Sequence, residues 1–160
     1  MSFAYEERAV AAVAALLADG TYGIAAQLRV IETAHSLDPH TLPDPEAVID
    51  YLAPADSRSP LVQVYDVAQE NTGEQWRNAI SGVEVEVAIT YNSDSDISAA
   101  ELVMRRFIQA VRMALHASPT CLSAVGQAWP TDANRTVEMT YDSTTRHGRA
   151  IGVVVRVQDP

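Results

Sequence analysis

The segment Val83–Tyr91 alternates between two kinds of residue, and it constrains the fold more than any other feature of the sequence. Its odd positions, from Val83 to Tyr91, are apolar. Side chains on a β-strand point alternately to opposite faces. The period of two therefore predicts a strand with one buried face and one face against water or a partner, typical of an antiparallel sheet. The second face would hold Glu84, Glu86, Ala88 and Thr90.

A long amphipathic helix is predicted after this strand, from about Ser98 to Ala117, with Pro119 ending it. One face forms a wide apolar stripe. The other is polar, and Glu101 and Arg105 on it have the spacing of a helical ion pair. The apolar stripe contains Ala100, Met104, Phe107, Ile108, Val111 and Leu115, and the polar face contains Glu101, Arg105, Gln109, Arg112 and His116.

The part of the chain before the alternating strand predicts helices, a proline-rich arm and a further strand. Residues 3–19 have the apolar spacing of a helix, and residues 22–37 continue as a second helix or as an irregular arm. A proline-rich arm covers about residues 38–60. Within it, Asp44 as N-cap and Pro45 at the first helical position predict a short helix through Tyr51, followed by a loop. Residues 61–67 predict a strand, and residues 68–82 a long polar loop.

The part after the long helix predicts three more strands, at residues 121–129, 136–141 and 150–157. The last two would pair as a hairpin around a polar turn at residues 142–149. The chain is thus expected to be one α+β domain covering residues 1–160. It would contain a mostly antiparallel four- to five-stranded sheet, with the long helix on one face and an N-terminal helix.

Charge limits the partners of the chain. The net charge is −10, and all basic residues apart from histidine are arginines, which argues against sequence-independent wrapping of nucleic acid. Residues 1–100 hold sixteen acidic residues and four arginines (−12), whereas residues 101–160 hold five acidic residues and seven arginines (+2). The two parts could form complementary surfaces on neighbouring copies, or they could simply mix on the surface of a monomer.

The sequence contains no convincing motif for catalysis, cofactor binding or metal binding. No phosphate-binding loop or nucleophile elbow is present, so we expect no catalytic residue and no cofactor. His35, Asp38 and His40 lack the spacing of known zinc motifs, and residues 92–96 lack the later positions of a calcium loop, so no metal site is expected. The single cysteine, Cys121, excludes an intrachain disulfide and is expected to be a small buried residue.

The sequence also lacks an apolar run of membrane-spanning length, and its first residues do not resemble a signal peptide. We therefore expect a soluble intracellular protein that acts through surfaces. Trp76, in the polar loop, is either an interface anchor or a side chain buried by that loop. Likewise, the turn at residues 142–149 either contacts a neighbour or is a plain hairpin turn. The candidate interface residues are Trp76, Glu84, Glu86, Arg105, Arg112, Arg146 and His147.

The order of these elements resembles the tail terminator, or tail-completion, proteins of tailed bacteriophages. The resemblance covers residues 61–157 and rests on the strand Val83–Tyr91, the helical segment Ala99–Leu115, and the strand pair 136–141 and 150–157. It implies a structural protein without enzymatic activity, found in the tail or neck of the virion after assembly in the host cytoplasm.

The resemblance further implies a homo-hexameric ring at the head-proximal end of the tail tube. Such a ring stops tube polymerisation and offers a docking face to the head connector, while DNA passes through its lumen without specific binding. Two alternatives stay open. One is another neck or head–tail joining protein, and the other is a small enzyme or ligand-binding α+β domain, which would need a deep pocket with converging polar groups.

Overall fold

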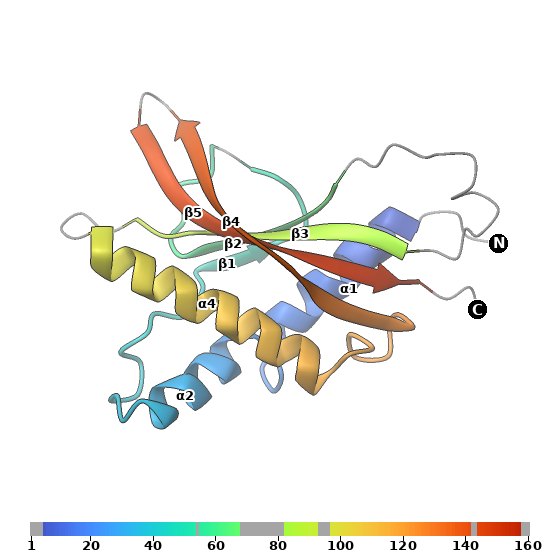
Figure 1. Cartoon of the computed structure of the whole chain (residues 1–160), viewed down its shortest axis with the longest axis horizontal. Coiled ribbons are helices and arrows are strands. Elements are labelled where there is room, and N and C mark those ends of the chain that lie inside the picture. Colours follow the sequence, from blue (N-terminus) through green and yellow to red (C-terminus); the bar gives the residue numbers. More distant parts are fainter. Residues whose placement is uncertain (1–4, 54, 68–81, 93–96, 142–143, 158–160) are drawn as a thin grey trace.

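The computed structural model describes residues 5–53, 55–67, 82–92, 97–141 and 144–157, which form three helices and one five-stranded sheet (Figure 1). The helices are α1 (Tyr5–Ala18), α2 (Ile24–Ala34) and α4 (Ile97–Ala117). The strands are β1 (Ala47–Ile49), β2 (Leu61–Asp66), β3 (Gly82–Thr90), β4 (Gln127–Tyr141) and β5 (Thr144–Arg156).

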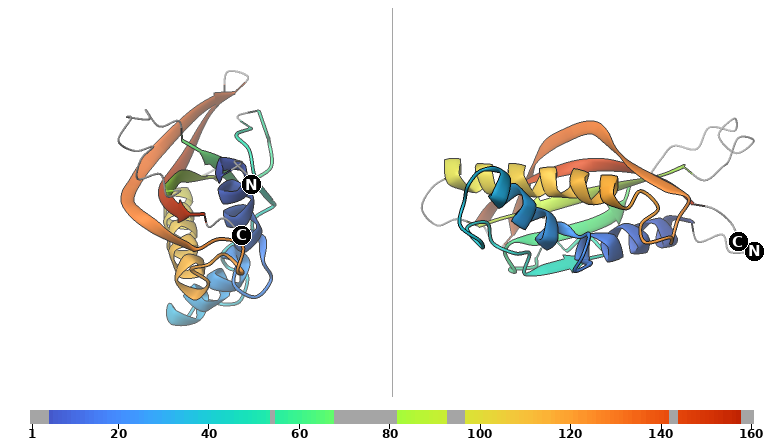
Figure 2. Two further views of the ribbon diagram at one scale, coloured as in Figure 1. Left: turned by 90° about the vertical axis from the view of Figure 1, so that its right-hand side faces the viewer. Right: turned by 90° about the horizontal axis from the view of Figure 1, so that it is seen from below.

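The sheet has the strand order β1-β2-β3-β5-β4, and every pair is antiparallel except β1 with β2. Helix α1 lies against β1, β2 and β3, whereas α4 lies against β3, β5 and β4 and also contacts α2. The helices form one layer and the sheet the other (Figure 2). The predicted α+β class, the mostly antiparallel sheet and the long helix packed on it are confirmed.

The core lies between the helices and one face of the sheet. Val64, Val87 and Ile151 stand opposite one another on β2, β3 and β5, and all three are fully buried. The apolar stripe predicted for the long helix faces them: Phe107 is 0% exposed, and the other stripe residues are buried as well. Burial of apolar surface between the helices and the sheet is the main stabilising contribution in such a domain.

The other face of β3 is more covered than its sequence pattern predicts. The prediction of a face open to water or a partner is wrong at Glu86, Ala88 and Thr90, which are 9%, 1% and 3% exposed. The neighbouring Gln63 on β2 is fully buried, and its Oε1 accepts a hydrogen bond from the backbone N–H of Ala53 (2.7 Å). The connection between β1 and β2 thus reaches this face, because a parallel strand pair needs a crossover that a period of two does not reveal.

The short helix predicted from Asp44 to Tyr51 is also wrong, because residues 47–49 form β1. Ala47 pairs with Leu61 in parallel register, and the N–H of Glu46 donates to the carbonyl of Pro60 (2.9 Å). The carboxylate of Glu46 accepts the N–H of Ser59 (2.9 Å). Pairing with β2 overrides the local capping signal, since a short helix has little stability of its own.

Between α1 and the arm, residues 22–37 were expected to form either a second helix or an irregular arm. The structure shows the helix, α2.

After α4, the strand predicted at residues 121–129 is wrong in its first half. Cys121, Leu122 and Ser123 all have positive φ values, of 48°, 59° and 69°, which a strand cannot contain. These residues therefore form the turn by which the chain reverses after α4, and β4 begins only at Gln127.

The C-terminal hairpin is confirmed, but its strands are longer than predicted. Residues 144–149 belong to β5, so the predicted eight-residue turn at 142–149 is wrong for all but residues 142–143, which lie outside the described part. The pairing of β4 with β5 shifts register between Pro130 and Asn134. There the Thr131 hydroxyl donates to the carbonyl of Gly152 (3.3 Å) and packs where a larger residue at Gly152 would clash.

Candidate interaction surfaces

The outer face of α4 carries the arginines predicted as interface residues. Arg105 pairs with Glu101 one turn earlier (2.9 Å), which confirms the predicted ion pair. Arg149, projecting from β5, reaches the other oxygen of Glu101 (3.4 Å). Arg105 has a side chain that is 57% exposed, so this pair contributes little to stability and leaves much of its guanidinium accessible.

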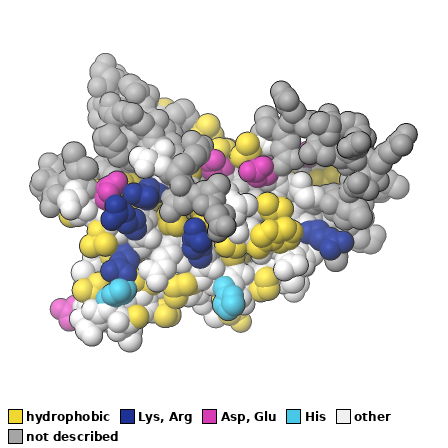
Figure 3. Space-filling model, viewed as in Figure 1, with side chains coloured by type: hydrophobic (Ala, Val, Ile, Leu, Met, Phe, Trp, Pro, Cys, Tyr) yellow, Lys and Arg dark blue, Asp and Glu magenta, His cyan; other side chains and the backbone are white. Residues whose placement is uncertain are grey.

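Arg112 lies two turns further along the same face. Within the described part of the chain, no acidic side chain lies at ion-pair distance from it. Leu102, at the other end of this face, is 50% exposed. Several arginine and histidine side chains lie among apolar ones on this side of the molecule (Figure 3). We call the row of Leu102, Arg105, Gln109 and Arg112 the arginine stripe; the first three are exposed and Arg112 is half-buried.

On the far side of the sheet, the chain leaving β1 forms an acidic corner. Tyr51 and Leu52 are adjacent in sequence and are 54% and 50% exposed. Asp50, just before them, is exposed and has no ion-pair or hydrogen-bond partner among the described residues. Glu46 precedes β1 and is exposed. We call Glu46, Asp50, Tyr51 and Leu52 the acidic corner.

The acidic corner and the arginine stripe lie at opposite sides of the domain. The corner flanks β1, which is one edge of the sheet, whereas α4 packs towards β5 and β4, which form the other edge. The two surfaces therefore do not meet within one chain.

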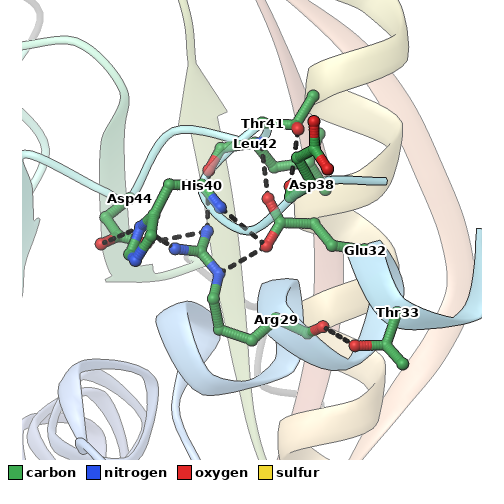
Figure 4. A network of polar contacts seen from close by, with 8 residues as sticks. All are labelled: Arg29, Glu32, Thr33, Asp38, His40, Thr41, Leu42 and Asp44. Carbon is green, nitrogen blue, oxygen red and sulfur yellow. Dashed lines mark hydrogen bonds and ion pairs between the residues drawn. The ribbon is translucent and has the colours of Figure 1, made fainter. Parts of the chain in front are cut away.

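A polar network anchored on Glu32 fixes the arm that leads to the acidic corner (Figure 4). Glu32 is 1% exposed, and its two carboxylate oxygens accept the backbone N–H groups of His40 (3.2 Å) and Leu42 (2.8 Å). Arg29 Nε lies 2.7 Å from the same carboxylate, and its terminal nitrogen donates to the carbonyl of Leu42 (2.7 Å) and pairs with Asp44 (3.1 Å).

Electrostatically, the two influences on Glu32 oppose one another. Burial raises the pKa of its carboxyl, but the N–H groups of Leu42 and His40 and the charge of Arg29 lower it, and the net result is a lowered pKa. The carboxylate is therefore ionised when it ties the arm to α2. The imidazole of His40 contacts Arg29 and lies 3.7 Å from Asp44, while His35 contacts Arg106 of α4. These histidines serve side-chain packing and polar contacts within the described chain.

The sheet face turned away from the helices exposes one row of residues. The row contains Glu84 on β3, Val154 on β5 and Trp129 on β4, and it continues at Val67, which follows β2 and donates its N–H to the carbonyl of Glu84. Trp129 is 40% and Val67 37% exposed, and Glu84 is half-buried. In the next row, Glu86 accepts a hydrogen bond from the hydroxyl of Tyr65 and is buried. Of the two predicted glutamates, Glu84 therefore stays accessible, whereas Glu86 as an open interface residue is wrong.

Sequence reasoning missed Trp129, although a tryptophan at a predicted strand end was the available signal. Trp76, the tryptophan that the sequence offers as a candidate interface residue, lies outside the described residues. Arg146 and His147 lie on β5, opposite Met139 and Glu138 of β4, and not in a turn. The structure does not bring Glu84 together with the arginines of α4, because the sheet and the helix layer separate them.

Three further features of the described residues concern cysteine reactivity, metal binding and membrane insertion. Burial raises the pKa of the Cys121 thiol to about 11, which keeps it protonated and unreactive, as expected of a small buried residue. Among the side chains that the structure describes, no three His, Cys, Asp or Glu residues converge as metal ligands would. None of the described helices has both the length and the apolar character needed to cross a bilayer.

Neither models of known protein families nor curated protein sequences gave a match to this chain.

Proposed function

We propose that this protein is a structural component of a bacteriophage tail, which forms a homo-hexameric ring on the head-proximal end of the tail tube. In this role it stops tube polymerisation and provides the docking face for the head connector. Support comes from the resemblance of residues 61–157 to tail terminator proteins, and from an α+β fold in which those residues form β2 to β5 and α4.

The observation that carries this proposal is the separation of charge across one domain. The arginine stripe and the acidic corner are two different surfaces of opposite charge, one at each side of the sheet. A contact between two unlike surfaces repeats from copy to copy, and it closes into a ring when the rotation between copies permits. Catalysis is not required for such a role.

Two further features fit the proposal. The row of Val67, Glu84, Val154 and Trp129 offers a third surface, distinct from the other two, for the tube or the connector. An exposed tryptophan among apolar neighbours is a common interface anchor. The net charge of −10 also suits a ring whose lumen lets DNA pass without binding it, because like charges repel.

The test is to measure the mass of the purified protein over a wide concentration range, alone and with the tail-tube protein of the same phage. We expect a ring, or a monomer that becomes a ring on the tube, and tubes that stop growing once capped. A monomer unaffected by both concentration and tube would disprove the proposal. A ring that binds the connector but leaves tube growth unchanged would instead identify another neck protein.

A further inference from the structure

We infer that neighbouring copies in the ring meet through the acidic corner of one copy and the arginine stripe of the next. The inference rests on the proposed function insofar as it requires several copies to assemble. It goes further by naming the two surfaces and the residues that join them.

Charge is the first argument. Asp50 is an exposed carboxylate without an ion-pair partner among the described residues. Arg112 is half-buried, and its guanidinium also has no ion-pair partner among them. By contrast, most other charges near them are satisfied within the chain: Asp44 by Arg29, Asp56 by Arg58, and Glu101 by Arg105. A second copy would provide each of the two unpaired groups with an opposite charge.

Apolar exposure is the second argument. Tyr51 and Leu52 in the corner and Leu102 in the stripe are each at least 50% exposed. Large apolar side chains that sit beside charges, one aromatic among them, are typical of the centre and rim of a protein interface. Each surface thus combines the same two components, with the charge reversed.

Rigidity is the third argument. The stripe belongs to a 21-residue helix whose inner face is buried in the core, and the corner is held by β1 pairing and by the Glu32 network. Surfaces fixed in this way lose little conformational freedom when they associate. Because the two surfaces lie on opposite sides of the sheet, each copy can use both at once.

Charge reversal tests the contact. We expect Asp50→Arg and Arg112→Asp each to weaken association of the proteins, or ring formation on the tube, by at least about tenfold. Mixing the two variants should restore assembly with alternating copies in a 1:1 ratio, since each faulty surface then meets an opposite charge. The double variant Asp50→Arg/Arg112→Asp should also assemble, because its two reversed surfaces match.

Matched controls are Arg156→Asp and Asp66→Arg, which reverse exposed charges outside the two surfaces and should leave assembly unchanged. Thermal unfolding checks that each variant is folded. Should a charge reversal unfold the chain, Tyr51→Ser and Leu102→Ser test the same surfaces without adding charge, and each should weaken assembly.

The outcomes separate this inference from the proposed function. Wild-type rings that cap tubes, together with folded variants that assemble normally, would overturn the contact and leave the function intact. Loss of assembly in the single variants without recovery in the mixture or the double variant would also overturn it. A wild-type protein that stays monomeric with and without tube would overturn both.

Discussion

At Glu32, one buried carboxylate holds a segment without regular structure against a helix. We expect Glu32→Gln to lower the free energy of unfolding by about 1.5–3 kcal/mol near neutral pH, because an amide cannot accept both N–H groups and loses the pairing with Arg29. Urea titration of both proteins measures the difference. Asp38→Asn, an exposed change in the same arm, should have little effect.

The same residue gives a pH dependence. The folded pKa of Glu32 lies below its ordinary value of 4.5, so its stabilisation is fully present above that value and is lost as the pH falls through the lowered pKa. The stability difference between wild type and Glu32→Gln should therefore shrink as the pH is lowered from neutral to well below 4.5. A difference that is the same at neutral and acidic pH would show that the ionised form is not what binds the arm.

Cys121 leads to a prediction about reactivity. Its thiol is 1% exposed and has a pKa of about 11, so few thiolates form and reagents cannot reach them. Thiol-specific reagents should leave the folded protein unmodified near neutral pH and label one site per chain in denaturant. Rapid labelling under native conditions would show that the turn at residues 121–123 opens.

At the scale of elements, α4 has two faces with very different contributions to stability. Phe107→Ala should cost about 3–5 kcal/mol, since the ring is fully buried between α4 and the sheet. Arg105→Ala should cost under about 1 kcal/mol, because its ion pair with Glu101 is exposed. Denaturant titrations of the two variants that gave equal costs would contradict the assignment of the faces.

Prediction from sequence succeeded where one short-range pattern determined the element. The apolar spacing from Ala100 to Leu115 and the alternation from Val83 follow directly from which side chains are buried. The predicted bounds of α4 and β3 are therefore correct to within a residue or so. It failed where distant pairing determined the outcome. Residues 47–49 became a strand through Leu61, and Glu86 became buried through its neighbours across the sheet.

The candidate surfaces show the same limit. Arg105 and Arg112 followed from helical spacing, because the polar face of an amphipathic helix is encoded locally. The acidic corner did not, since Tyr51 and Leu52 are apolar in sequence and only the crossover after β1 leaves them at the surface. Trp129 was missed for a similar reason: whether a strand face is covered depends on segments remote from it.

At the scale of the whole molecule, an assembly built on opposite charges should respond to salt. Raising NaCl from about 0.05 M to about 1 M shortens the Debye length to about 3 Å and should weaken association of the free protein. Light scattering at fixed protein concentration measures this. The free energy of unfolding of the monomer, which depends mainly on apolar burial, should not fall over the same salt range. Association that strengthens with salt would mean that apolar contact alone joins the copies.

The two edges of the sheet have a consequence for how the chain behaves when many copies are present. A long, regular free edge adds further strands and leads to fibres. Here β1 is only three residues long, and β4 contains Pro130, which has no N–H, and a shift of register beside it. Neither edge is therefore regular along its whole length, which limits how many backbone hydrogen bonds another chain could add there when copies are concentrated. Side-chain surfaces, whose geometry can close an assembly, are then the more favourable contacts between copies.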